Sequence, residues 1–234
     1  MGMMAGMDQQ HDVELVALLC TRLCHDLAGP IGAVSAGVEL LSDDADPAFV
    51  VEATALLRHS ADASSARLKF FRTAFGEPGR SSLSGPVRSL IEGYAGALSG
   101  GITLDWRDQG GGLGTTGAGE GEAVRLLLTL SLVAADCLCG SGGLTVELHP
   151  AGPSGRRFAV TASGLRVALD PTVRDALEGR RDALTARSAP AALLHRLAAP
   201  GGGVVTEETP GRVLLTACHP LAAETGRAEF INQS

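Results

Sequence analysis

The chain has 234 residues, enough for one large domain or two small ones, and its 45% hydrophobic and 19% charged residues are typical of a globular protein. Its net charge is −7 and it has no dense cluster of Lys and Arg, which disfavours nucleic-acid binding. Lys69 is the only lysine, so a phosphate-binding loop built around a lysine elsewhere is excluded.

Targeting signals and cysteine usage bear on the compartment. The sequence has no run of about 18 apolar residues, so no membrane span is expected. The first ten residues lack the pattern of a secretory signal, and five cysteines without framework spacing fit reduced thiols. We therefore expect a cytoplasmic protein. Cys20, Cys24 and His25 could be imagined as metal ligands, but no fourth ligand is evident, and we expect no metal site.

Residues 8–77 predict a helical hairpin that follows a flexible tail over residues 1–7. Apolar residues three and four apart mark one face of a helix over 8–42, about 50 Å long at 1.5 Å per residue. Asp46 as N-cap and Pro47 in the first turn predict a second helix over 47–75, which Gly76 and Pro78 end. The predicted faces are Leu15, Leu19, Leu23, Leu27, Ile31, Val34, Val38 and Leu41, then Val50, Leu57, Ala61, Ser64, Leu68, Phe71 and Phe75.

A two-helix hairpin buries too little surface to be stable alone. We expect its apolar seam to pair with a second copy, which would give a four-helix bundle across a dimer axis. In the alternative, the seam docks on the second half of the same chain.

Residues 83–221 predict a second domain of mixed character, followed by a loose tail over 222–234. Its alternation of strand and helix patterns indicates an α+β layer of helices on an antiparallel or mixed sheet. The expected elements are helices over 86–98, 120–138 and 189–199, strands over 102–106, 144–149, 157–161, 203–208 and 212–217, and a glycine-rich loop over 110–119.

The segment Leu23-Cys24-His25-Asp26-Leu27-Ala28-Gly29-Pro30-Ile31 places a histidine in mid-helix with an acid beside it and a proline five residues later. A neutral imidazole is a nucleophile near neutral pH, and a carboxylate bonded to one ring nitrogen leaves the other free to attack phosphorus. Asp26 is the candidate for that carboxylate. Arg22, one turn earlier, is the candidate to contact phosphoryl oxygens. In the alternative, His25 is a core or surface histidine without chemistry.

Small residues surround this histidine. Glycine in a helix interior costs about 0.8–1 kcal/mol relative to alanine, so Gly29, Gly32 and Gly37 need a reason. We expect them to leave His25 open to the helix of another protein. His59, His149 and His219 are interpreted as structural or solvated.

His25-Asp26-Leu27-Ala28-Gly29-Pro30-Ile31 resembles the H-box of bacterial histidine kinases. On that resemblance, the hairpin is similar to their dimerisation and phosphotransfer domain. The second half is similar to their ATP-binding domain, which has the Bergerat fold.

The nucleotide-binding boxes of such kinases are not matched. Asn232 is the only asparagine, the Asp-x-Gly-x-Gly box is degraded to Ala162-Ser163-Gly164-Leu165-Arg166, and the last glycine box is missing near 189–203. A kinase-shaped chain that keeps the histidine and loses the nucleotide site resembles the ChpT-type histidine phosphotransferases.

That resemblance implies a homodimer that takes a phosphoryl group from the receiver domain of a hybrid histidine kinase. It would pass the group to response regulators such as CtrA-like regulators. It implies no cofactor of its own, because the receiver supplies Mg²⁺, and no nucleic-acid or membrane partner. Kinases that are also phosphatases often carry Thr or Asn four residues after the histidine, where this chain has Gly29, so weak phosphatase activity is expected. An ATP-dependent sensor kinase and a non-catalytic dimeric scaffold remain alternatives.

Overall fold

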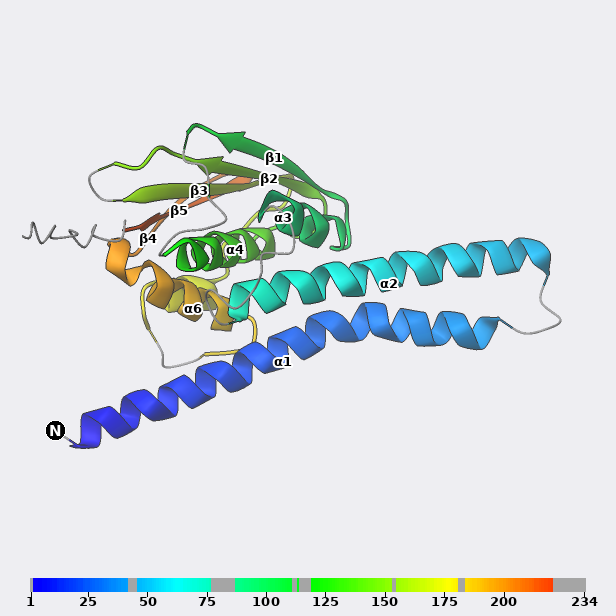
Figure 1. Ribbon diagram of the computed structural model, residues 1–234, viewed down its shortest axis with the longest axis horizontal. Helices are drawn as coiled ribbons and strands as arrows, with labels where there is room; N and C mark the ends of the chain where they lie inside the picture. The colour runs from blue at the N-terminus through cyan, green and yellow to red at the C-terminus, as the bar shows by residue number, and fades with distance from the viewer. Residues whose placement is uncertain are drawn as a thin grey trace, which may run out of the picture.

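Two long helices, α1 (Gly2–Leu40) and α2 (Pro47–Phe75), run antiparallel and project from a layered second domain (Figure 1). The computed structural model describes residues 2–41, 46–76, 87–110, 113, 119–152, 155–180 and 184–220, and the side chains from residue 9 onward. The predicted hairpin is therefore present. Helix α1 begins at Gly2 rather than at residue 8, so the expected tail over 1–7 is helical from Gly2. The predicted tail over 222–234 lies outside the described residues.

The start of α2 follows the predicted signal, whereas its end does not. The Asp46 carboxylate accepts a hydrogen bond from the backbone N–H of Ala48 at 3.0 Å, and Pro47 occupies the first turn. Gly76 follows the helix with an extended backbone, φ −75° and ψ 178°, and not the left-handed turn of a glycine cap. A Cβ at Gly76 would lie 2.2 Å from the carbonyl oxygen of Arg72, so close backbone approach is what requires glycine there.

The second domain is a five-stranded mixed sheet covered by helices on one face (Figure 1). The strand order is β1-β2-β3-β5-β4, in which β1 and β2 are parallel and every other neighbouring pair is antiparallel. A crossover through α4 joins β1 to β2, as a parallel pair requires. The α+β prediction is thus confirmed, and the sheet is mixed. The elements are α3 (Val87–Gly96), β1 (Ile102–Asp108), α4 (Glu120–Asp136), β2 (Gly142–Leu148), β3 (Arg156–Ser163), α5 (Pro171–Leu177), α6 (Ala189–Ala198), the 3₁₀ turn η1 (Ala199–Gly201), β4 (Val204–Thr209) and β5 (Arg212–His219).

Helix α5 was not predicted, although its start repeats a signal used elsewhere in the chain. The Asp170 carboxylate caps it by accepting from the backbone N–H of Thr172 at 2.9 Å, and Pro171 stands in the first turn. Asp46-Pro47 has the same arrangement at the start of α2. The helix is only seven residues long, which is too short to show an apolar period.

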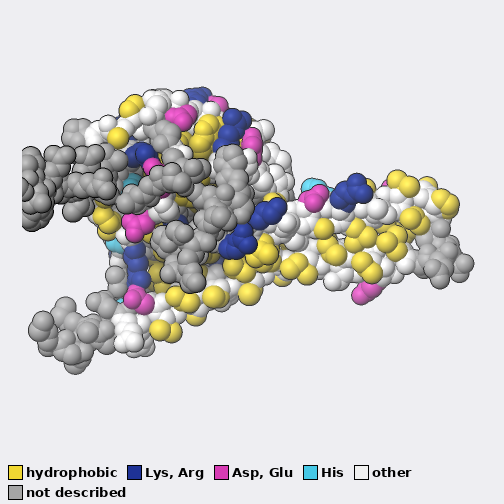
Figure 2. All heavy atoms as spheres, in the orientation of Figure 1, with side chains coloured by type: hydrophobic (Ala, Val, Ile, Leu, Met, Phe, Trp, Pro, Cys, Tyr) yellow, Lys and Arg dark blue, Asp and Glu magenta, His cyan; other side chains and the backbone are white. Residues whose placement is uncertain are grey.

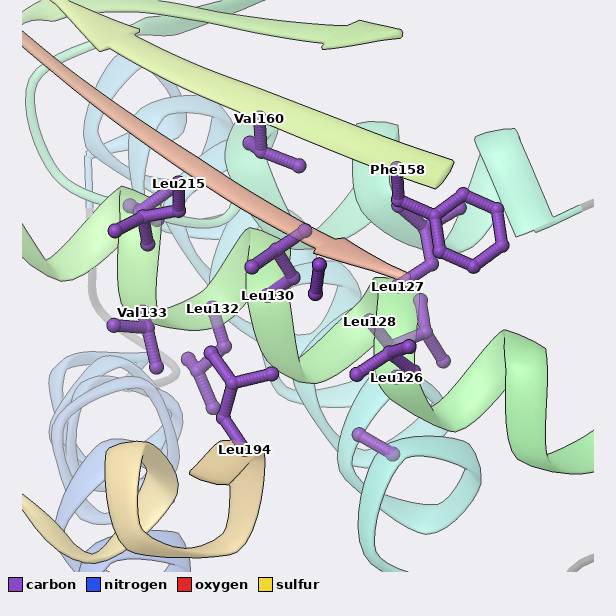
Figure 3. Packing of buried hydrophobic residues seen from close by; sticks show 14 of the residues in the cluster. Leu126, Leu127, Leu128, Leu130, Leu132, Val133, Phe158, Val160, Leu194 and Leu215 are labelled. Carbon is purple, nitrogen blue, oxygen red and sulfur yellow. The ribbon is translucent and has the colours of Figure 1, made fainter. Parts of the chain in front are cut away.

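Helix α4 is the centre of the core. Its side chains from Ala123 to Ala135, Arg125 excepted, are buried, and they point both toward the sheet and toward α6 (Figure 3). Phe158, Val160 and Leu215 meet them from the strands, and Leu194 meets them from α6. A helix that is apolar on every side is stable only when it is enclosed, so α4 ties the sheet to the outer helices.

The buried face of α2 differs from the predicted stripe. Phe71 is buried as expected, but Leu68 is 52% exposed, and the adjacent Phe70 is fully buried and stacks on Tyr94 with ring centroids 4.3 Å apart. The last two turns of α2 enter the core of the second domain. The buried face of α2 is therefore set by contacts with that core as well as by packing against α1. The buried residues of α2 are Ala53, Ser60, Ala63, Phe70, Phe71, Thr73 and Ala74.

Helix α1 is long and apolar enough over Gln9–Leu40 to cross a membrane by length and composition, which differs from the expectation of no candidate span. Its surroundings are those of a hairpin helix. It packs along α2, and near its middle Arg22 and Asp26 form ion pairs. Charged groups at the centre of a spanning helix are costly in lipid.

Candidate active site

His25 lies on α1 where the hairpin leaves the second domain, and its side chain is 84% exposed. Its Nδ1 atom is 3.2 Å from Oδ1 of Asp26, in the contact that the sequence predicted. With Asp26 ionised, Nδ1 carries the proton and donates it, which leaves the Nε2 lone pair available. The side chain of Asp26 is only 14% exposed, so a half-enclosed carboxylate holds a solvent-facing imidazole.

Pro30 explains the backbone of this segment. Proline has no N–H, so it cannot bond to the carbonyl four residues earlier, which is that of Asp26. Nη1 of Arg67, from α2, donates to that carbonyl oxygen instead, and Nη2 donates to the carbonyl of Ala97 at 2.6 Å. The helix therefore continues past the proline, and Arg67 ties the Asp26 backbone to the end of α3. Sequence reasoning missed Arg67, since only the proline hinted that a distant donor was needed.

Arg22 lies one turn before His25, as predicted, but its guanidinium is held by two carboxylates. Its Nε donates to Oδ2 of Asp26 at 2.7 Å. Its Nη1 and Nη2 donate to the two carboxylate oxygens of Asp136 at 2.8 and 2.7 Å. Three of its five N–H donors are thus used inside the protein, and the side chain is only 12% exposed.

Asp136 completes this cluster from the other domain, and no pattern in the sequence pointed to it. It is the last residue of α4. Burial raises the pKa of its carboxyl above the usual range, while the hydrogen bonds and charge of Arg22 act in the opposite direction. Burial alone would lower the pKa of Arg22, but its bonds to Asp136 and then to Asp26 raise it overall, so the guanidinium is charged.

A cavity of about 690 Å³ opens beside His25, between the hairpin and the second domain. Arg22, Arg67 and Arg187 supply positive charge to its wall, and Asp26 and Asp136 supply negative charge. The space can therefore receive a polar group of either sign next to the imidazole. The lining residues are Thr21, Arg22, His25, Asp26, Arg67, Leu98, Ser99, Ile102, Ala135, Asp136, Leu138, Cys139, Gly140, Ala186 and Arg187.

The residues that resemble a degraded glycine box make structural contacts here. Where the degraded glycine box was recognised, Ala162 is buried in β3, and Gly164 donates its N–H to the carbonyl of Gly211 in the β4–β5 turn.

Three comparisons relate this chain to known proteins. Residues 85–212 match the family model of the histidine phosphotransferase C-terminal domain. The protein phosphotransferase ChpT of Brucella abortus (strain 2308) is 31% identical over 166 residues, which cover 68% of this chain and 72% of that protein. A 1.7 Å structure of a bacterial phosphotransferase is 27% identical, covers 88% of this chain and 96% of that chain, and superposes with a TM-score of 0.69. The chain therefore belongs to the ChpT-like histidine phosphotransferases and is a protein phosphotransferase of phosphorelay signalling.

Proposed function

We propose that His25 is the residue that carries the phosphoryl group, taken from the receiver aspartate of a hybrid histidine kinase and passed to the receiver aspartates of response regulators. The observation that supports this most directly is the exposed imidazole whose Nδ1 is held by Asp26. CtrA-like regulators are the proposed acceptors, and the cytoplasm is the proposed location. The acceptors are those that the family resemblance implies, and the location is the one that the cysteine usage favours.

In the first transfer, the Nε2 lone pair of His25 attacks the phosphorus of the donor's aspartyl phosphate. The N–P bond forms as the P–O bond of the acyl phosphate breaks, and the aspartate leaves as a carboxylate. The proton on Nδ1 stays in place, so the phosphorylated ring is cationic, and the carboxylate of Asp26 stabilises it. In the second transfer, an acceptor carboxylate attacks the phosphorus, and the bonding pair returns to Nε2.

The surface around His25 suits the approach of a receiver domain. A Cβ built at Gly29 or Gly32 meets no atom within 4 Å, so both positions face open space beside the histidine. The receiver would bring the Mg²⁺ that neutralises the transferred group, so the proposed transfer requires no cofactor from this chain. The cavity between the domains lets residues of the second domain, such as Arg187, contribute to docking.

We also propose that the protein is a homodimer. Part of the hairpin docks on the second half of its own chain, where Leu15 and Phe70 are buried. Elsewhere apolar side chains, only some of them on the predicted faces, stay uncovered along the hairpin (Figure 2), which favours pairing with a second copy into a four-helix bundle. These side chains are Val13, Val16, Ile31, Val38, Leu40, Leu41, Phe49, Val51, Leu56 and Leu68.

The deciding experiment is phosphoryl transfer from a ³²P-labelled receiver domain to the purified protein. We expect label on the wild type and on His59→Ala, whose histidine is exposed on α2, and none on His25→Ala. Equal labelling of both variants would refute the assignment of His25. No transfer to any of them would leave a non-catalytic scaffold.

The same protein incubated with labelled ATP and Mg²⁺ tests the kinase alternative. We expect no label within the time in which the receiver transfers its group completely. Rapid labelling of His25 by ATP would establish a sensor-type kinase and overturn the relay.

A further inference from the structure

A continuous line of contacts joins the core of the second domain to the proposed nucleophile. The two carboxylate oxygens of Asp136 hold Nη1 and Nη2 of Arg22, Nε of Arg22 holds Oδ2 of Asp26, and Oδ1 of Asp26 faces Nδ1 of His25. Arg22 and Asp26 each have a partner on both sides of this line, so neither side chain can rotate without losing a contact. We infer that Asp136 is a positioning residue for phosphotransfer, which fixes the orientation and tautomer of His25 through Arg22 and Asp26. This inference rests on the proposed role of His25.

Asp136 is well placed to act as a fixed point. It ends α4, whose buried side chains form the centre of the core. The backbone just after it is held as well, because the carbonyl of Cys137 accepts from the N–H of Ala168 and the N–H of Cys139 donates to the carbonyl of Arg166. The position of this carboxylate is therefore set by the second domain and not by a loose loop.

Stability alone does not account for an acid at this position. The C-terminal end of a helix carries partial negative charge, so Asp136 is unfavourable there by itself. A mostly buried ion pair also contributes little net stability, because desolvation offsets the attraction between the charges. A bidentate pair does impose geometry, since the planar guanidinium fits a carboxylate in one arrangement.

Arg22 thereby takes a different role from the expected contact with phosphoryl oxygens. With Nε committed to Asp26, and Nη1 and Nη2 each committed to Asp136, it links the two carboxylates. Without Asp136 the guanidinium would be free to rotate, and Asp26 would lose the contact that keeps Oδ1 directed at the imidazole. The second domain would in this way act on the chemistry as well as on docking.

The test measures the imidazole and the transfer separately in Asp136→Asn, Asp136→Glu and Arg22→Gln. The tautomer of His25 is read at pH 8 from nitrogen chemical shifts of ¹⁵N-histidine-labelled protein, with the signal assigned by its loss in His25→Ala. We expect the Nδ1–H form to dominate in the wild type, and Asp136→Asn to shift the population toward Nε2–H. Rates of transfer from the labelled receiver should fall about tenfold in kcat with little change in KM, as is typical when the partner that orients a functional imidazole is lost.

Two comparisons exclude a general loss of structure. Asp12→Asn breaks another ion pair between α1 and the second domain, that with Arg196, and should leave the tautomer and kcat at wild-type values. In the Arg22→Gln background, Asp136→Asn should cause no further loss of rate, because Asp136 acts through Arg22. With Arg22 present, Asp136→Glu should retain more of the transfer rate than Asp136→Asn. A wild-type tautomer and kcat in Asp136→Asn, or a change in KM alone, would overturn the inference. If the wild type accepts no phosphoryl group, the proposed function fails, whereas the tautomer measurement still decides whether Asp136 orients His25.

Discussion

The hairpin and the second domain use apolar side chains in opposite ways. In α4 nearly every side chain from Ala123 to Ala135 is enclosed within one chain. In the hairpin the last two turns of α2 are enclosed, whereas valines and leucines along both helices are exposed. The contrast shows that the second domain encloses its apolar surface within one chain, whereas the hairpin leaves much of its own exposed, which is consistent with the proposed dimer.

The largest expected effect is a loss of stability when a buried side chain of α4 is truncated. Leu127→Ala removes a fully buried side chain from the core and should lower the free energy of unfolding by about 2–5 kcal/mol in urea titrations. Leu165→Ala, at a leucine that is 99% exposed in the same domain, should change it by no more than about 0.5 kcal/mol. Similar losses for both variants would mean that α4 is not the centre of the core.

Substitutions of exposed apolar residues in the hairpin should weaken dimerisation without changing the stability of the folded chain. Val38→Asp and Leu56→Asp place charges at exposed apolar residues of the hairpin and should weaken dimerisation at least about tenfold, or 1.4 kcal/mol, in sedimentation equilibrium. The melting temperature of the dissociated chain should stay close to that of the wild type. Val205→Asp, at an equally exposed residue of β4, is the matched control. Dimers that tolerate both hairpin variants would place the interface elsewhere.

Alkaline pH should weaken the second domain through two buried acids. Burial raises the pKa of the Cys137 thiol from 9.0 to about 12, and burial also raises the pKa of the Tyr94 hydroxyl. Between the unfolded and folded pKa values the unfolded chain has already lost its proton, so stability is complete below about pH 9 and falls as pH rises. Each group contributes a slope of at most about 1.4 kcal/mol per pH unit.

Unfolding in urea at pH 7, 9 and 10.5 measures this slope. Cys137→Ala and Tyr94→Phe should each flatten it, whatever they do to stability at pH 7. A slope unchanged in both variants would show that other groups cause the alkaline loss.

The smallest expected effect is a difference in stability between alanine substitutions at two glycines of α1. Gly32→Ala meets no atom within 4 Å and should stabilise the helix by about 0.5–1 kcal/mol. At Gly37 a Cβ would lie 2.7 Å from Cδ2 of Leu57, so Gly37→Ala should gain less or lose stability. If Gly32→Ala raises the melting temperature and also slows transfer from the receiver, the glycine serves the approach of the partner. Transfer at the wild-type rate would argue against that role.

Much of the molecule could be predicted from local sequence. The N-cap signal of Asp46-Pro47 and the glycine and proline after Phe75 placed α2 at Pro47–Phe75, and alternating strands indicated the hairpin of β4 and β5 nearly at its observed bounds. The contact between His25 and Asp26 was also expected, although adjacent residues of a helix point about 100° apart and the contact needs a favourable rotamer. Such features depend on residues within a turn or two of one another, so their signals lie in the sequence itself.

The rest of the site was decided by tertiary structure. Arg67 reaches the Asp26 carbonyl across 41 residues, and Asp136 reaches Arg22 across 114. The face of α2 that is buried was likewise set by Tyr94 and the core, not by the stripe read from α2 alone. The positions of the proposed nucleophile and of the acid beside it could be read from local sequence. Only the packing of the two domains decided what holds them in place, because a pairing between distant residues leaves no periodic pattern in a single chain.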